Sequence, residues 1–126
     1  MKVIKNRKIK IAVVGCGRIS KKHFEAIISH SSNLELVAVC DSDLGTMSSH
    51  KERYNVAGYI SFEEMLKSEK LDILALCTPS GIHPEQTVIA ASYGINVITE
   101  KPMATRWQEG LRMVRACDDA GVHLFV

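Results

Sequence analysis

Two glycines separate an apolar run from an amphipathic stretch near the start of the chain. The run Ile9–Val14 has the length and composition of a buried strand, and apolar residues recur at helical spacing from Ser20 onward. Between them, Gly15 permits a tight turn and Gly17 leaves room for a ligand to approach the backbone. Ser20 takes the third position of the G-x-G-x-x-G pattern, where a small residue allows close helix–strand packing. This order predicts a turn that holds a pyrophosphate against the free N–H groups of a helix N-terminus.

Strand and helix signals alternate along the whole chain. Strands are expected at Ile9–Val14, Leu34–Cys40, 58–60, 73–77, 95–99 and 123–126. Such alternation predicts an α/β domain, a doubly wound parallel sheet with right-handed crossovers and helices on both faces. The expected strand order is 3-2-1-4-5-6, that of a Rossmann domain. Residues 1–126 suit one such domain, with the chain ending at or in the sixth strand.

Capping residues and prolines mark the starts of the helices between these strands. Starts are expected near Ser20, Leu44, Ser61, Pro84 and Thr105. Thr105 is expected to cap the last helix, which carries Trp107, Leu111, Val114 and Cys117 on one side. We expect this side to pack in the core.

The composition favours a folded protein over a disordered or nucleic-acid-binding chain. Hydrophobic residues make up 46% of the chain and charged residues 24%, with a net charge of +2. The basic cluster from Lys2 to Lys10 has no interleaved aromatic residues, so no nucleic-acid partner is expected. No apolar run reaches the roughly 18 residues of a membrane span, so no membrane partner is expected. The four cysteines lack metal-ligand spacing, which predicts no metal site and a reducing compartment, the cytoplasm.

Asp41 ends the second expected strand. It lies near the roughly 20-residue offset at which a dinucleotide-binding domain places its ribose-binding carboxylate. A carboxylate there repels a 2′-phosphate, and no Arg or Lys occurs at 42–44 to bind one. The expected cofactor is therefore NAD rather than NADP. The alternative is that Asp41 only ends a strand or caps a helix.

Two more loops are expected at the carboxyl edge of the sheet, where ligands of such domains bind. The loop Thr78-Pro-Ser-Gly-Ile-His83 follows the fourth strand, and Glu100-Lys-Pro102 follows the fifth. We expect the first loop to line the ribose and nicotinamide of the cofactor, and the lysine of the second to point into the same crevice. The alternatives are turn residues with a helix-capping His83 in the first loop, and a solvated lysine in the second.

In order and spacing these motifs resemble the glucose-fructose oxidoreductase / inositol dehydrogenase family. The resemblance is carried by Gly15-Cys-Gly-Arg-Ile19, His23, Asp41, the loop from Thr78 to His83, and Glu100-Lys-Pro102. It extends over the whole chain. The segments 78–85 and 99–107 look closest to the branch that oxidises carbon 3 of UDP-N-acetylglucosaminuronate for bacterial lipopolysaccharide biosynthesis.

The resemblance implies a role for each motif. Lys101 is the implied catalytic residue beside the nicotinamide and the sugar hydroxyl, in a lysine–proline peptide that is often cis. The implied cofactor contacts are Gly15, Gly17, Arg18 and Ile19 at the pyrophosphate, Asp41 at the adenine ribose, Thr78, Ser80 and His83 at the nicotinamide half, and Glu100 as a further contact.

The family also has a second α/β domain after the sixth strand, which supplies a histidine, most sugar contacts and most oligomer contacts. None of it is present in these 126 residues. The resemblance therefore implies the NAD-binding half of an oxidoreductase for a nucleotide-sugar, inactive alone and a homo-oligomer at full length.

Three other functions stay open on the sequence. The chain could serve a dehydrogenase of the same family for another sugar or inositol. It could be a non-catalytic NAD-sensing module, although such a module would not need Lys101. It could also be a methyltransferase of the same architecture that binds S-adenosylmethionine, against which the phosphate-type glycine turn and the Glu-Lys-Pro segment argue.

Overall fold

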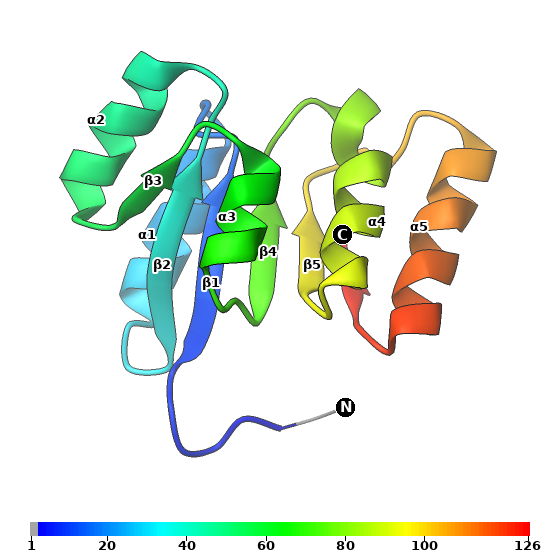
Figure 1. Ribbon diagram of the computed structural model, residues 1–126, viewed down its shortest axis with the longest axis horizontal. Coiled ribbons are helices and arrows are strands. Elements are labelled where there is room, and N and C mark those ends of the chain that lie inside the picture. The colour runs from blue at the N-terminus through cyan, green and yellow to red at the C-terminus, as the bar shows by residue number, and fades with distance from the viewer. Residues whose placement is uncertain (1–2) are drawn as a thin grey trace.

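A computed structural model describes residues 3–126, which form one six-stranded sheet (Figure 1). Its strands are β1 (Ile9–Val14), β2 (Leu34–Cys40), β3 (Ala57–Tyr59), β4 (Ile73–Leu76), β5 (Asn96–Thr99) and β6 (Leu124–Phe125). All neighbours pair in parallel, in the order β3-β2-β1-β4-β5-β6. The expected fold class and strand order are confirmed, and strand ends differ from expectation by about one residue.

Helices cover both faces of the sheet. They are α1 (Ser20–Ser29), α2 (Leu44–Tyr54), α3 (Phe62–Ser68), the short 3₁₀ helix η1 (Ser80–Ile82), α4 (His83–Ser92) and α5 (Trp107–Ala120). Side chains alternate along β1, so that Ile11 and Val13 pack toward α1 and α2, whereas Ala12 and Val14 pack toward α3 and α4. Because both faces are covered, the central strands are apolar on both sides.

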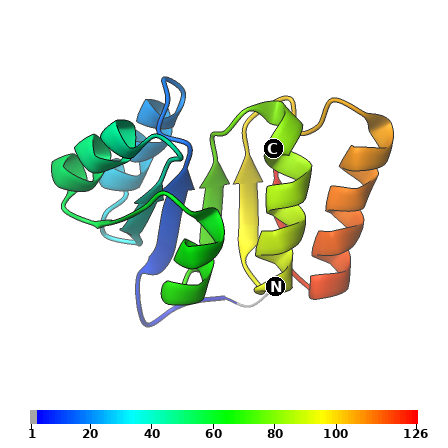
Figure 2. The ribbon, with the colours of Figure 1, turned by 45° about the horizontal axis from the view of Figure 1, so that its top comes forward.

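The carboxyl ends of β1, β4 and β5 lie at one edge of the sheet, each followed by a loop (Figure 2). Backbone hydrogen bonds continue past the strand ends: Gly15 N–H donates to Cys40 O at 2.8 Å, and Cys77 N–H donates to Val14 O at 2.7 Å. Glu100 N–H likewise donates to Leu76 O at 3.0 Å. These bonds fix the starts of the loops relative to one another.

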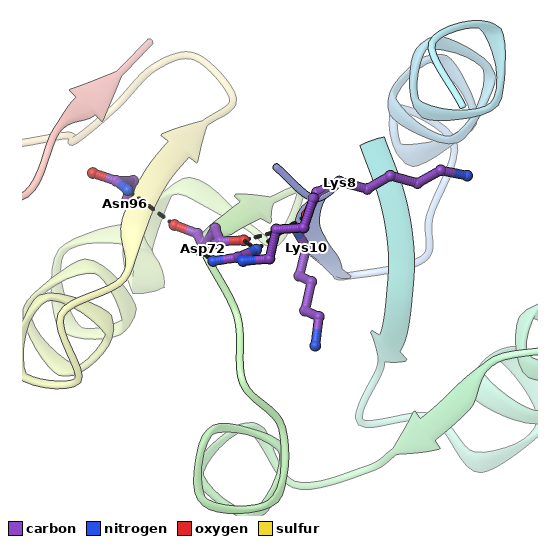
Figure 3. A network of polar contacts seen from close by, with 5 residues as sticks. Lys8, Lys10, Asp72 and Asn96 are labelled. Carbon is purple, nitrogen blue, oxygen red and sulfur yellow. Dashed lines mark hydrogen bonds and ion pairs between the residues drawn. The ribbon is translucent and has the colours of Figure 1, made fainter. Parts of the chain in front are cut away.

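A polar network centred on Asp72 ties together the opposite, amino edge of the sheet (Figure 3). The Arg7 guanidinium donates to both carboxylate oxygens of Asp72, at 2.7 and 2.9 Å. Lys10 N–H donates to the same carboxylate at 2.8 Å, and the Asn96 amide donates to Asp72 O at 3.0 Å. The segment before β1 is thereby fastened to the starts of β4 and β5.

The expectations for the last helix are wrong in two respects. The helix α5 begins at Trp107, and no side chain caps it, so Thr105 is not its cap. Trp107 is 81% exposed and Val114 is 41% exposed, whereas Met113 and Cys117 are buried. The physical reason is that residues three or four positions apart line one face of a helix, and every face of the helix has this same spacing. Spacing alone therefore does not say which face is buried. The stripe that packs against α4 and β6 is the one with Met113 and Cys117.

Candidate functional site

The turn after β1 depends on glycine at Gly15. Its φ is +85°, and a Cβ there would lie 2.8 Å from backbone atoms of Cys77 and Thr78. At Gly17, by contrast, an added Cβ would meet no described atom within 4 Å. The first N–H groups of α1 donate to the carbonyls of 17–19, at 3.2 to 3.4 Å, whereas the N–H groups of 17–19 have no acceptor among the described residues. The turn therefore offers an anion free donors, the positive end of a helix dipole and an open approach.

Asp41 lies directly after β2, beside the glycine turn. Its Oδ2 accepts a hydrogen bond from Cys16 N–H at 2.8 Å, and its Oδ1 accepts one from Asp43 N–H at 2.9 Å. A carboxylate has about four lone-pair sites, so two accepted bonds leave capacity for ligand hydroxyls. The side chain thus holds the glycine turn in place and remains able to bind a diol.

A cleft of about 480 Å³ lies between the loops that follow β1, β2, β3 and β4. Its lining residues are Val14, Gly15, Gly17, Cys40, Asp41, Ser42, Ile60, Phe62, Cys77, Thr78, Pro79, Ile82 and Gln86. The expected site residues Gly15, Gly17, Asp41 and Thr78 meet here. Among the lining residues in the described part of the chain, Asp41 is the only charged one. The cleft therefore presents no cationic side chain to a 2′-phosphate.

Sequence reasoning missed the apolar side of this cleft. Ile60 and Phe62 follow β3, and Gln86 comes from α4. Ile82 of η1 also lines the cleft, and it belongs to the loop that the sequence predicts at the cofactor. Applying the strand-end rule to the third strand, as to the others, would have found Ile60 and Phe62. Gln86 is harder to find because it lies on a helix, where it accepts a hydrogen bond from the Thr78 hydroxyl at 2.6 Å.

Five expected contacts do not line the cleft, Glu100 among them. Arg18 and Ile19 are exposed on the glycine turn, and Ser80 begins η1. His83 is buried, with 1% of its surface exposed. Its Nε2 lies 2.7 Å from Thr78 O and its Nδ1 lies 3.3 Å from Pro102 O. The ring thus contacts backbone carbonyls instead of the cleft.

The loop after β5 holds Glu100 against α1 and leaves Lys101 exposed. Glu100 Oε1 lies 2.7 Å from Nε2 of His23, and this hydrogen bond is the main reason that the pKa of Glu100 is below its ordinary value. His23 belongs to the motif carrying the resemblance, but the sequence assigned it no role. Lys101 lies at the same sheet edge as the cleft without lining it. The Lys101–Pro102 peptide is cis, as the resemblance implied.

The cysteines are free and buried, three of them around the carboxyl edge. Burial is the main cause that raises the pKa of Cys16 and Cys77 to about 12 and that of Cys40 to about 11. Near neutral pH these thiols stay protonated and act as small apolar side chains. Within residues 3–126, no group of three or more His, Cys, Asp or Glu could hold a metal ion. None of the helices described there is long and apolar enough to cross a bilayer.

The strand order, the glycine turn at the start of α1 and the carboxylate after β2 together define a dinucleotide-binding Rossmann domain. Residues 9–126 match the sequence model of the oxidoreductase family with an NAD-binding Rossmann fold. The chain belongs to this family, and its cofactor is NAD. The family resemblance is confirmed, and membership in a family of NAD-binding oxidoreductases leaves no support for the methyltransferase alternative.

Solved structures of two dehydrogenases resemble the chain closely. The WlbA dehydrogenase of Bordetella pertussis, in complex with NADH and UDP-GlcNAcA, is 48% identical, with a TM-score of 0.94 over 95% of this chain and 37% of that chain. WlbA of Chromobacterium violaceum, with the same ligands, is also 48% identical, with a TM-score of 0.95 over 98% of this chain and 36% of that one.

A curated relative extends the comparison to another sugar dehydrogenase. The D-glucoside 3-dehydrogenase of Escherichia coli K12 is 33% identical over 113 residues, which are 89% of this chain and 31% of that protein. The chain therefore spans about a third of the length of its relatives.

Proposed function

We propose that this chain is the cofactor-binding part of an NAD-dependent dehydrogenase that oxidises carbon 3 of a UDP-N-acetyl-hexosaminuronate. The main support is a dinucleotide cleft beside Lys101, in a chain 48% identical to two dehydrogenases solved with NADH and UDP-GlcNAcA. Lipopolysaccharide biosynthesis, a cytoplasmic location and a homo-oligomeric full-length protein are part of this proposal. A dehydrogenase of the same family for another sugar or inositol is the alternative.

Within this proposal, the glycine turn and Asp41 divide the binding of NAD. Backbone N–H groups at Gly17, Arg18 and Ile19 bind the pyrophosphate, since no cationic side chain lines the cleft among the described residues. Asp41 accepts hydrogen bonds from the adenine ribose. The loop with Thr78 and Ser80 lies along the nicotinamide half. Bound NAD supplies the hydride acceptor.

Lys101 is the proposed catalytic residue of this part of the protein. An ammonium group donates hydrogen bonds, so Lys101 can orient the sugar hydroxyl beside the nicotinamide. We propose that the proton of the hydroxyl goes to a residue outside this chain, and that residues 1–126 alone bind NAD without oxidising a sugar.

Titration and turnover measurements test the proposal. The 126-residue chain should bind NADH and produce no NADH from NAD and UDP-GlcNAcA. In the full-length protein, Lys101→Ala should lower kcat about 100-fold or more while the Kd for NADH changes little. Lys70→Ala, which removes an exposed lysine near the amino edge, is the matched control.

Each outcome bears on a separate part of the proposal. Absence of NADH binding at millimolar concentration would remove the cofactor assignment for this chain. Hydride transfer by the 126 residues alone would contradict the expected inactivity. A near-normal kcat for Lys101→Ala would exclude the catalytic role of this lysine.

A further inference from the structure

One buried side chain connects the two loops of the proposed site. His83 is the first residue of α4, and each of its ring nitrogens faces a backbone carbonyl. Nε2 lies 2.7 Å from the oxygen of Thr78, a residue that lines the cleft. Nδ1 lies 3.3 Å from the oxygen of Pro102, the residue after Lys101. The ring therefore lies between the cofactor loop and the lysine loop.

The chemistry of these contacts sets the direction of the hydrogen bonds. A carbonyl oxygen only accepts, so each ring nitrogen must donate an N–H to make a bond there. The shorter contact assigns the donor role to Nε2, and Nδ1 lies in contact with Pro102 O. The Thr78 hydroxyl donates a hydrogen bond to Gln86, which lies on α4 together with His83. Helix α4 therefore fixes both the carbonyl and the side chain of Thr78.

Neither ligand contact nor helix capping explains this arrangement. His83 is 1% exposed and is not among the lining residues of the cleft. A residue that caps a helix N-terminus accepts hydrogen bonds from free N–H groups, whereas the His83 ring faces carbonyls and no side chain caps α4. The alternative of a helix-capping His83 is therefore wrong, and a link between two loops remains.

We propose that His83 is a positioning residue that holds the cofactor loop and Lys101 in a fixed relation. Its donor at Nε2 keeps Thr78 at the cleft, and its contact with Pro102 holds the loop that carries Lys101. The inference rests on the proposed function, because it takes the loop after β4 as the nicotinamide side. It goes beyond that function by assigning the geometry to a buried residue that does not line the cleft.

Two ligands and three variants test this link in the 126-residue chain. NADH carries the nicotinamide and ADP-ribose lacks it. A defect on the nicotinamide side of the site therefore weakens the binding of NADH and leaves the binding of ADP-ribose unchanged. In His83→Gln the amide nitrogen can take the place of Nε2, and in His83→Asn that of Nδ1. We expect His83→Ala to raise the Kd for NADH about 10-fold and to change the Kd for ADP-ribose by no more than about twofold. His83→Gln should restore most of the affinity for NADH.

Carbonyl ¹³C chemical shifts report each hydrogen bond separately. The Thr78 carbonyl shift should change in His83→Ala and His83→Asn but not in His83→Gln. The Pro102 carbonyl shift should change in His83→Ala and His83→Gln but not in His83→Asn. The exposed His30 supplies the control, and His30→Gln should leave both shifts and both affinities unchanged.

The possible failures are distinguishable. If the native chain binds neither ligand, the proposed function fails, and the two carbonyl shifts still test the link. If NADH affinity is unchanged in folded variants, or if NADH and ADP-ribose weaken equally, His83 does not position the nicotinamide side. If His83→Ala lacks a cooperative unfolding transition, it is not folded. The NADH affinities and carbonyl shifts of His83→Gln and His83→Asn then test the link.

Discussion

Single polar side chains at the carboxyl edge have structural partners as well as proposed ligands. The carboxylate of Asp41 accepts a hydrogen bond from Cys16 N–H, and that of Glu100 is held by His23. Bonds of this kind fix each rotamer before a ligand arrives, which lowers the entropic cost of binding. A substitution at such a residue therefore alters both the shape of the turn and the contacts offered to NAD.

Replacing Asp41 with Asn should change the preference between dinucleotides. The variant keeps one acceptor oxygen but loses the negative charge, so we expect NAD to bind about 10-fold more weakly and NADP to lose much less. Fluorescence titration with NADH and NADPH measures the ratio of the two Kd values. Asp43→Asn is the matched control, because Asp43 caps α2 through Thr46 N–H at 2.9 Å and asparagine caps equally well. An unchanged ratio in Asp41→Asn would refute the assigned role.

At the scale of elements, the site is made by strand ends and by the turn that begins α1. Parallel pairing sets which loops meet, since Val14 of β1 lies between Cys40 of β2 and Leu76 of β4. Helix α5 shows what periodicity leaves undecided. Its residues have helical spacing, as predicted, but Trp107 and Val114 of the predicted core side are exposed, whereas Cys117 is buried.

The two glycines of the turn should respond differently to alanine. At Gly15 a left-handed φ costs about 1–2 kcal/mol for other residues, and the close backbone atoms add to this cost, so Gly15→Ala should lower the free energy of unfolding by more than that. Gly17→Ala meets no described atom and should keep native stability. Its methyl group would instead lie where the pyrophosphate is proposed to bind. We therefore expect the Kd for NADH to rise about 10-fold.

Urea denaturation and NADH titration of both variants separate these effects. Each glycine is the control for the other. An unchanged free energy of unfolding in Gly15→Ala would contradict the steric argument. An unchanged Kd for NADH in Gly17→Ala would show that the pyrophosphate does not bind beside Gly17.

At the scale of the whole molecule, the Asp72 network and the proposed binding cleft lie at opposite edges of the sheet. The network joins the segment before β1 to β4 and β5 at the amino edge (Figure 3), whereas the residues that line the cleft follow the carboxyl ends of the strands. Substitutions in the network can therefore be made without changing a residue that lines the cleft.

The Asp72 network should make stability depend on acid pH. The hydrogen bond from Arg7 is the main cause that lowers the pKa of Asp72 in the folded chain. Its stabilisation is therefore complete above the unfolded pKa, about 4, and is lost as the pH falls through the lower folded pKa. Asp72→Asn should be less stable than the native chain at neutral pH, with a difference that shrinks in acid.

Urea midpoints between neutral and acid pH measure this difference. Arg7→Gln removes the partner of Asp72 and should therefore reduce the loss of stability that acid causes. The affinity for NADH should stay unchanged in both variants. A stability difference that does not vary with pH would show that the ion pair is not its source.

Local rules were enough to predict the architecture and the centre of the site. Apolar runs, glycine conformation and capping residues act within a few positions of the chain, and the alternation of strands and helices restricts the topology. The strand order and the placement of Gly15, Gly17, Asp41 and Thr78 at one edge follow from these rules alone.

Only the tertiary structure decided how side chains from distant segments pair. His23 with Glu100, His83 with Pro102, and the apolar wall of Ile60 and Phe62 depend on how helices pack onto the finished sheet. The same holds for the choice between Met113 and Trp107 as the buried residue of α5. Periodicity determines the spacing of such residues, but the neighbouring element determines which face is buried, because burial is a property of two surfaces in contact.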